Sequence, residues 1–252
     1  MRYLGGKYRV SKHLAEVINQ HEGNVYLEPF MGSCWVTRLI KYKHRIAGDV
    51  HEELVEMFRK LQDGWEPPDH ITKEEYDDIR ANKTADKYSK ELVAFAGFGC
   101  AFAGSYFRKY AGEIHPARSK RSVLKKIKAL MDVHFYVDDY RNLNPKGCVI
   151  YCDPPYDDSY GFRITGVRGN GRFDNGEFWE VMRNWSKDNV VYISENEAPD
   201  DFECVLEIPV KPGVRTTKGC ETRIERLFHI PTNAELLDLD TVEPKTLLWP
   251  SI

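Results

Sequence analysis

Residues 149–156 constrain the fold of this chain more than any other stretch, because they join a strand signal to a rigid polar loop. Residues 149–152 are a short, apolar, β-favouring run, which is typical of a buried strand in an α/β sheet. Proline has no backbone N–H and cannot continue a central strand, so the strand ends at Asp153. Open α/β sheets bind their ligands at the carboxyl ends of their strands. Asp153 is therefore a candidate site residue.

The loop that follows this strand reads Asp153-Pro154-Pro155-Tyr156. It combines an anion, a backbone carbonyl fixed between two prolines, and a flat ring. These groups suit a planar amine that is gripped by two acceptors and stacked on the ring, and the exocyclic amine of a nucleobase is such a group. An ordinary strand-to-loop turn with a surface tyrosine is the alternative. We predict that the four residues are catalytic.

The first 61 residues alternate between strand and helix signals. A helix is expected over 11–20, a strand over 24–27, a helix over 35–41, a strand over 45–48 and a helix over 51–61. The loop 28–34 contains Gly32, and Asp49 follows the second strand. A glycine loop and an acid about twenty residues later is the first half of a nucleotide-binding α/β unit. A plain tight turn is the alternative for Gly32.

The alternation stops between residues 64 and about 128, where helices are expected over 72–80 and 89–95. A Gly- and aromatic-rich run, 95–110, leads into a basic segment. Residues 105–128 hold eight Lys and Arg against one Glu, a net charge of +7, whereas the whole chain carries −3. We interpret this region as an inserted, mainly helical domain with a phosphate-tracking surface. A solvated basic helix face, or a small core for the aromatic rings, is the alternative.

We expect the polar residues of this region, rather than its phenylalanines, to contact nucleic acid. The candidates are Ser105, Tyr106, Arg108, Lys109, Tyr110, Arg118, Lys120 and Arg121.

Alternation resumes after the insert. Strands are expected over 134–137, 149–152 and 190–194, a helix over 178–185, and a closing hairpin over 204–210 and 223–229. The predicted fold is an α/β sheet with a terminal antiparallel hairpin. Residues 1–62 and 130–252 form one domain, and residues 63–129 form the inserted domain.

Composition narrows the setting of the protein. No stretch approaches the roughly 18 apolar residues of a membrane span, and the first residues lack the apolar core of a signal peptide. We therefore expect a cytoplasmic protein. The six cysteines form no Cys-x-x-Cys pair, and the eight histidines show no metal-binding spacing, so we predict neither a metal nor a disulfide framework.

Three stretches in order resemble the Dam-like (D12 class) DNA adenine-N6 methyltransferase family. They are Arg-Tyr-Leu-Gly-Gly-Lys at 2–7, Glu-Pro-Phe-Met-Gly-Ser at 28–33, and Asp-Pro-Pro-Tyr at 153–156. Residues 225–228, Glu-Arg-Leu-Phe, are similar to the family's last strand. The resemblance covers about residues 1–230. It implies a Rossmann-like class I methyltransferase sheet and an inserted target-recognition domain.

The resemblance also implies a cofactor, S-adenosyl-L-methionine, which leaves as S-adenosyl-L-homocysteine. Cofactor contacts are implied for Tyr3, Lys7, Phe30, Gly32, Asp49, Asp139 and Asp153. The chain departs from the family pattern at several positions: Tyr3 replaces a frequent Trp, Cys34 a small residue, and His51 an Asn, and Glu195 extends a usual Ser-Asn pair.

The activity implied is site-specific transfer of a methyl group to N6 of an adenine flipped out of duplex DNA. The same loop chemistry also suits guanine N2 in ribosomal RNA or cytosine N4 in DNA, and a non-catalytic DNA-binding module is a further alternative. We expect double-stranded DNA as the partner and a monomer in solution. The expected setting is a bacterial or phage-infected cell, with or without an accompanying restriction nuclease. The sequence does not reveal the recognised DNA site.

Overall fold

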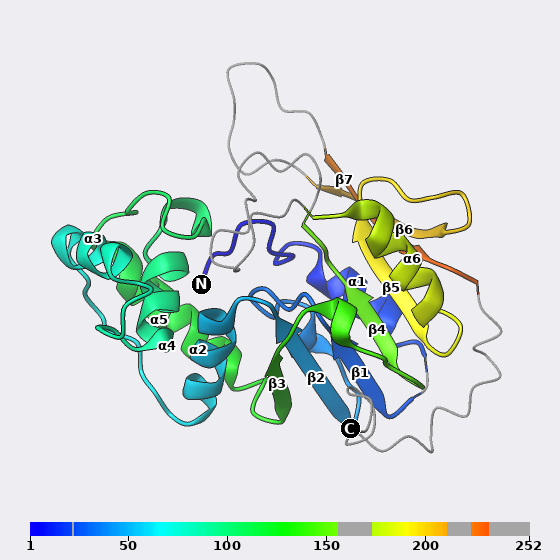
Figure 1. Ribbon diagram of the computed structural model, residues 1–252, viewed down its shortest axis with the longest axis horizontal. Coiled ribbons are helices and arrows are strands. Elements are labelled where there is room, and N and C mark those ends of the chain that lie inside the picture. Colours follow the sequence, from blue (N-terminus) through cyan, green and yellow to red (C-terminus); the bar gives the residue numbers. More distant parts are fainter. Residues whose placement is uncertain (22, 156–172, 211–222, 232–252) are drawn as a thin grey trace.

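A computed structural model describes residues 1–21, 23–155, 173–210 and 223–231 of the chain (Figure 1). Its strands form one sheet in the order β3-β2-β1-β4-β5-β7-β6. The strands are β1 (Val25–Glu28), β2 (His44–Asp49), β3 (Val133–Val137), β4 (Val149–Cys152), β5 (Val190–Glu195), β6 (Glu203–Val210) and β7 (Arg223–His229). Neighbouring strands among β1–β5 are parallel, whereas β7 is antiparallel to both β5 and β6. The predicted Rossmann-like sheet with a terminal antiparallel hairpin is therefore confirmed.

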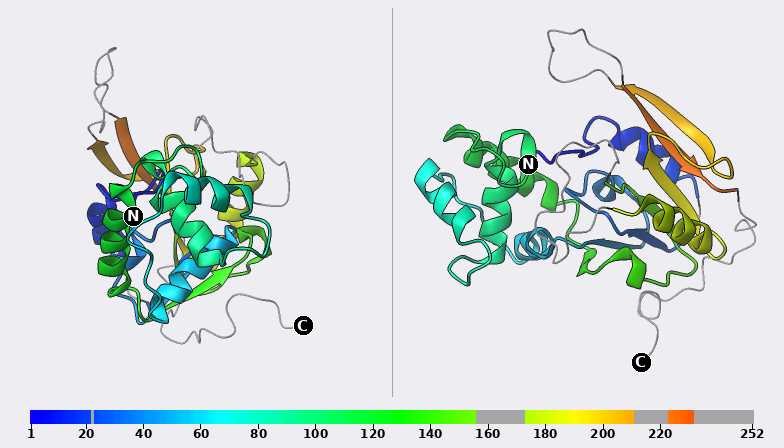
Figure 2. Two further views of the ribbon diagram at one scale, coloured as in Figure 1. Left: turned by 90° about the vertical axis from the view of Figure 1, so that its left-hand side faces the viewer. Right: turned by 45° about the horizontal axis from the view of Figure 1, so that its top comes forward.

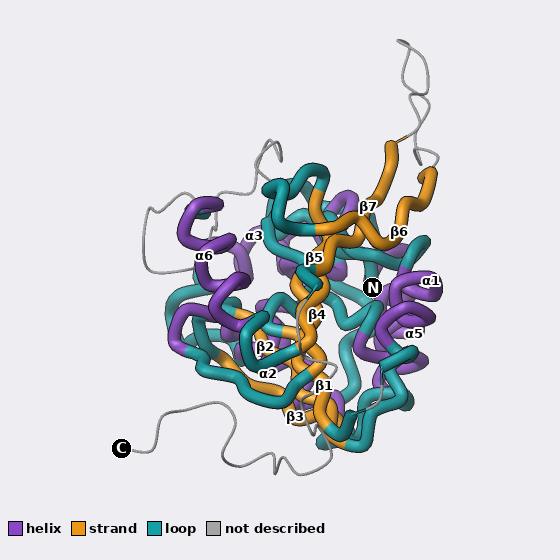
Figure 3. The backbone as a smooth tube through the Cα atoms, turned by 90° about the vertical axis from the view of Figure 1, so that its right-hand side faces the viewer, coloured by secondary structure: helices purple, strands orange, loops and turns teal. Residues whose placement is uncertain are grey.

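Helices cover both faces of the sheet. They are α1 (Ser11–Ile18), α2 (Glu52–Gln62), α3 (Lys73–Ala81), α4 (Lys90–Ala94), α5 (Ile114–Ile127) and α6 (Asn175–Trp185), with short turns η1 (Thr37–Leu39), η2 (Phe95–Gly99), η3 (Phe102–Gly104) and η4 (Tyr140–Asn142). Figure 3 shows α6 on one side of the strands and α1 on the other. Strand side chains alternate accordingly, because Leu27 and Ile150 pack in the cluster with α6 while Tyr26 and Tyr151 pack in the cluster with α1.

The helix expected over 35–41 is wrong, since only the single turn η1 forms there. Long-range hydrogen bonds take the place of a helical ladder. The Thr37 N–H donates to the Glu28 carboxylate at 3.0 Å, and the Arg45 guanidinium donates to the Thr37 carbonyl at 3.1 Å. Ile40 then turns to extended backbone with a ψ of 141°. These contacts come from β1 and β2, so a local pattern could not predict them.

The helices between β2 and β3 gather at one end of the sheet, on the left of Figure 1 and nearest the viewer in the left view of Figure 2. They share a core with the sheet, because Phe58 of α2, Phe95, Val123 of α5 and Phe135 of β3 belong to one cluster of buried side chains. The predicted domain boundaries at 62/63 and 129/130 stay a prediction. Helix α2, which lies outside the predicted insert, packs against α4 within this cluster.

The Gln62 side chain lies where the chain enters this helical region and bonds to the segment where the chain leaves it. The Gln62 amide donates to the carbonyl of Leu130 at 2.7 Å and to that of Val133 at 2.8 Å. The end of α2 and the start of β3 are therefore tied together. Within the described ranges, no helix is both long and apolar enough to cross a bilayer.

Candidate active site

The predicted motifs meet at the carboxyl edge of the sheet where β1 and β4 lie side by side. Strand order reverses at this point, and open α/β sheets bind ligands in the crevice that such a reversal creates. The loop 28–34 leaves the end of β1, and Asp153 follows β4. Asp49 ends β2 at the same edge. Residues separated by more than 100 positions in the sequence are thus neighbours in space.

The N-terminal Gly-Gly-Lys motif forms a tight turn against the loop after β1. The Gly6 N–H donates to the Tyr3 carbonyl at 3.0 Å, and Gly5 has a φ of 77°, which favours glycine. A Cβ at Gly6 would lie 3.0 Å from the Tyr3 carbonyl oxygen, so glycine suits the tight turn, and Ser33 Oγ and Trp35 Cδ1 would lie in ordinary contact with it at 3.4 Å.

Lys7 joins the N-terminal turn to the loop after β4. Its ammonium lies 2.9 Å from Asp153 Oδ1 and 2.8 Å from Glu225 Oε1, and its side chain is only 6% exposed. Burial on its own lowers the pKa of Lys7, but the two carboxylates outweigh it and raise that pKa above the usual value. Lys7 is therefore a permanent cation at this edge of the sheet.

The loop after β1 is held by Asp49. The Gly32 N–H donates to Asp49 Oδ2 at 3.1 Å, and the His51 N–H donates to Asp49 Oδ1 at 3.0 Å. Burial raises the pKa of Asp49, and these two hydrogen bonds act in the opposite direction. Gly32 has a φ of 43°, and a Cβ there would lie 3.0 Å from the Tyr3 ring. Tyr3, Gly32 and Asp49 thus lie together, and their contacts with a cofactor stay a prediction.

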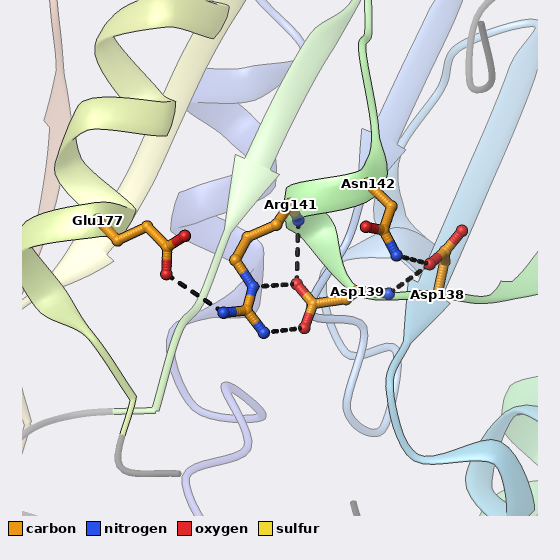
Figure 4. Close-up of polar contacts among 5 residues, drawn as sticks. All are labelled: Asp138, Asp139, Arg141, Asn142 and Glu177. Atoms are coloured by element: carbon orange, nitrogen blue, oxygen red, sulfur yellow. Dashed lines mark hydrogen bonds and ion pairs between the residues drawn. The ribbon is translucent and has the colours of Figure 1, made fainter. Parts of the chain in front are cut away.

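Asp139 and Asp138 follow β3 and differ in their partners (Figure 4). The Arg141 guanidinium donates to both carboxylate oxygens of Asp139, at 2.9 and 2.6 Å, and also reaches Glu177 at 3.2 Å. These bonds lower the pKa of Asp139. Asp138 instead accepts from the Asn142 amide at 2.7 Å. Arg141 fixes Asp139 in place, and a cofactor contact by Asp139 stays a prediction.

Phe30 lies on the α6 side of the loop after β1, in a group of aromatic rings. Its ring centroid is 5.1 Å from that of Tyr140, 6.2 Å from Phe173 and 6.0 Å from Phe178. The group offers an apolar wall beside the crevice. Pro154 is buried and Pro155 is partly exposed, whereas Tyr156 lies outside the described residues. The predicted stacking role of Tyr156 is therefore untested.

Two acidic residues that were not among the predicted site residues join this site. Glu225 of β7 reaches Lys7 because the hairpin folds back against β5. Glu195 ends β5, and its Oε2 is buried with no hydrogen-bond partner among the described residues. Burial, with nearby Asp153 and Glu225, raises the pKa of Glu195 to about 8. The family resemblance drew attention to both positions, but it did not indicate a place beside Lys7 and Asp153, which depends on the pairing of β5 with β7.

The predicted DNA-contacting residues divide into exposed and inward-packed members. Arg108, Lys109, Arg118 and Arg121 are exposed. Tyr106 packs edge-on against His51 at 4.6 Å, and Tyr110 donates to the Ile71 carbonyl at 2.6 Å. Lys120 is ion-paired with Asp69 at 2.9 Å and with Glu66 at 3.2 Å. Ser105 is partly exposed.

Phe102 is exposed over 62% of its surface, although phenylalanines were expected to contribute less than the polar residues. It opens the short turn η3, just before Ala103, whose φ is 57°. The Gly104 carbonyl of this turn accepts from the Leu4 N–H at 3.2 Å. The turn that carries Phe102 is therefore bonded to the N-terminal motif through Gly104.

Two observations fit a bound S-adenosylmethionine. Asp49 presents a partly buried carboxylate at the end of β2. Ser33 Oγ is buried and has no hydrogen-bond partner within the described part of the chain. In the same residues, no three His, Cys, Asp or Glu side chains gather as potential metal ligands.

Solved structures resemble this chain only distantly. A putative RNA methyltransferase from Pyrococcus horikoshii has 12% identity and a TM-score of 0.39, covering 87% of this chain and 79% of its own. A precorrin 8w decarboxylase from Methanobacterium thermoautotrophicum has 9% identity and a TM-score of 0.38, covering 88% and 90%. No curated protein matches the sequence.

The family comparison is far more extensive. A model of the D12 class N6 adenine-specific DNA methyltransferases matches residues 3–94 and 101–212. These residues include the first motif from Tyr3 onward, both other motifs, and the helical region between them except residues 95–100. The chain belongs to the D12 class N6 adenine-specific DNA methyltransferase family, and it is an enzyme of that class.

Proposed function

We propose that the protein transfers the methyl group of S-adenosylmethionine to N6 of an adenine that is flipped out of duplex DNA. The observation that carries the proposal is the position of Asp153. It follows β4 at the strand-order reversal, and it pairs with Lys7 of the N-terminal motif beside the loop after β1. Cofactor and target base would meet at this carboxylate.

Asp153 and the Pro154 carbonyl would activate the amine. The lone pair of adenine N6 is delocalised into the ring, so the amine is a poor nucleophile. Two acceptors, one for each N–H, increase the electron density on nitrogen and favour a tetrahedral geometry. As positive charge develops on N6, the Asp153 carboxylate stabilises it, and such stabilisation is strongest in a site from which water is excluded.

Lys7 keeps Asp153 in its useful, ionised form. Its ammonium lies 2.9 Å from Asp153 Oδ1, and a proton on that carboxyl group would remove the charge that the ammonium attracts. The ionised form is therefore favoured. The same contact fixes the direction of the carboxylate, and positioning supplies much of the rate in a group transfer between two bound reactants.

Tyr3, Lys7, Phe30, Gly32, Asp49 and Asp139 remain the proposed cofactor-binding residues. When bound, S-adenosylmethionine supplies an electrophilic methyl group on its sulfonium. Asp49 has hydrogen bonds from two backbone N–H groups, and its carboxylate oxygens retain lone pairs for hydroxyl groups of the ligand.

Duplex DNA is the proposed partner. A base that is paired inside the double helix cannot reach the Asp153 carboxylate. It must leave the stack, which costs unstacking and unpairing energy. The exposed Arg108, Lys109, Arg118 and Arg121 are the proposed phosphate contacts. The exposed ring of Phe102 adds an aromatic group on which a base can stack.

The decisive experiment is transfer of a tritiated methyl group from S-adenosylmethionine to duplex DNA, followed by nucleoside analysis. We expect label in N6-methyl-2′-deoxyadenosine only. Asp153→Ala should abolish transfer while its circular dichroism spectrum stays that of the wild type. Ribosomal RNA is offered in parallel. Label in N4-methylcytosine of the DNA, or in guanine of the RNA, would show that the acceptor is not adenine N6. No transfer to any nucleic acid would favour a non-catalytic DNA-binding module.

A further inference from the structure

One basic residue of helix α5 points into the protein rather than toward solvent. Lys126 is 2% exposed, and its ammonium donates to the Ser33 carbonyl in the loop after β1. The same ammonium lies 3.8 Å from the ring centroid of Trp35 and 5.9 Å from that of Phe58. Its neighbours Lys125 and Lys128 are exposed.

A buried ammonium is costly unless it has a partner, and Lys126 takes part in none of the ion pairs among the described residues. Burial lowers the pKa of Lys126 to about 7. A lysine in such surroundings is common at functional sites and rare elsewhere. A stable fold alone would be served as well by an apolar residue of similar length.

The Ser33 carbonyl, which accepts the hydrogen bond from Lys126, lies in an unusual stretch of backbone. Gly32 has a φ of 43° and Cys34 a φ of 54°, so Ser33 stands between two residues in the left-handed region. Cysteine adopts that region only at a cost in free energy, and the surrounding structure must enforce it. Lys126 supplies a hydrogen bond at the carbonyl between the two positions.

We propose that Lys126 is a positioning residue for the cofactor: from helix α5 of the predicted insert, its ammonium holds residues 32–34 in the conformation that binds S-adenosylmethionine. The inference rests on the proposed function, since it assigns this loop to that cofactor. It means that the recognition insert supplies part of the cofactor site. Lys126 acts through Ser33 and touches no reacting atom.

Protonation then governs cofactor affinity, because a neutral amine gives a weaker hydrogen bond and loses its attraction to the Trp35 ring. The charged or titratable groups around Lys126 are the Met1 amino group, Glu28 of β1, Cys34 of the loop and Arg38 of η1. Affinity should fall as pH rises through the pKa of Lys126.

Folding stability should respond to Lys126 in the opposite sense. The folded-state pKa lies below the ordinary value of 10.5, so between about 7 and 10.5 the unfolded chain binds more protons. The Lys126 contribution to stability therefore rises with pH across that window. The charged form of Lys126 thus lowers folding stability while it raises cofactor affinity. A residue whose role is only to stabilise the fold would not show these opposite effects.

The test is calorimetric titration of S-adenosylmethionine into the full chain between pH 6 and 9. Wild type should lose roughly tenfold in affinity across this range. Lys126→Met keeps the length and apolar contacts of the side chain, and it should bind about tenfold more weakly at pH 6.5 with little pH dependence. Lys125→Met, on the exposed neighbour, should behave as wild type. Thermal unfolding at pH 6.5 should show that Lys126→Met is no less stable.

Glu28 also titrates near this range, so Glu28→Gln is the second variant. It should keep the wild-type fall in affinity. Three outcomes would each overturn the inference: a wild-type affinity that does not change with pH, loss of that pH dependence in Glu28→Gln, or wild-type affinity of Lys126→Met at pH 6.5. The first two outcomes do not depend on the folding of Lys126→Met. A folded wild type that binds no S-adenosylmethionine at any pH would overturn the proposed function as well, whereas cofactor binding without these differences would overturn this inference alone.

Discussion

The ammonium of Lys7 lies 2.9 Å from Oδ1 of Asp153, although 145 positions separate the two residues in the sequence. The N-terminal motif and the loop after β4 therefore meet at one edge of the sheet. Lys7 also pairs with Glu225 of the closing hairpin, so three distant segments are joined by one side chain.

Replacing Lys7 by Met should lower the rate of methyl transfer by about 10²-fold, because Asp153 loses both its orientation and its compensating charge. Rate measurements from pH 5 to 9 check this loss. Lys12→Met, on the exposed face of α1, is the control and should leave the profile unchanged. An unaltered rate in Lys7→Met would contradict the coupling.

Glu28 should make the protein less stable as pH rises. Burial raises the pKa of Glu28 to about 8, although Thr37 and Tyr26 donate hydrogen bonds to it. Between pH 4.5 and 8 the folded state binds more protons than the unfolded chain, so the Glu28 contribution is full below that window and lost through it. Glu28→Gln should unfold within about 1 kcal/mol of wild type at pH 5 and be the more stable of the two at pH 8.5.

Urea denaturation at those two pH values measures this difference. Tyr26 and Thr37 can still donate to the glutamine carbonyl, so the comparison isolates the ionisation. Parallel stability curves for the two proteins would show that Glu28 is charged throughout.

Glu195 should limit activity at alkaline pH. Its pKa of about 8 means that it carries a proton at neutral pH, next to Asp153 and Glu225. Above that pH a further negative charge appears in the site and competes for Lys7. Glu195→Gln imitates the protonated acid, so it should keep neutral activity within about twofold and lose the alkaline decline. A pH–rate profile that still declines near pH 8 in this variant would assign the decline to another group.

DNA affinity should depend unequally on the basic residues of the helical region. Arg108→Ala should weaken binding and reduce the slope of log affinity against log salt by about 1, since one phosphate contact is lost. Lys120→Ala should change the slope less, because Asp69 and Glu66 already hold that ammonium. Phe102→Ala should weaken binding without changing the slope, because stacking is largely independent of salt. Fluorescence anisotropy at 50 to 200 mM salt separates the three; equal slopes for Arg108→Ala and Lys120→Ala would rule out this division.

The sequence predicted the sheet well because strand and helix signals alternate with little ambiguity and prolines mark the end of β4. Gly32, Asp49 and Asp153 lie at one edge because each follows a parallel strand, and only the family resemblance suggested that Lys7 belongs with them. It failed at residues 35–41, where hydrogen bonds from Glu28 and Arg45 replace a helix.

From the sequence, Lys126 is indistinguishable from the other basic residues of segment 105–128, which we interpreted as a charged surface. Only the packing of α5 against the loop after β1 turns that side chain inward. The same limit applies to Glu195 and Glu225, since their places depend on the pairing of β5 with β7. Charge counts along a chain do not distinguish a solvated lysine from a buried one.

The bond from Gln62 to both Leu130 and Val133 has a practical consequence for engineering. It ties together the two ends of the segment between α2 and β3. Phe95 and Val123 of that segment pack in one core with Phe135 of the sheet, so an exchange of the proposed recognition region between relatives has to keep these side chains. The junction on the far side lies before Val123, because a graft that replaces the whole segment would also remove Lys126 and its hydrogen bond to the Ser33 carbonyl.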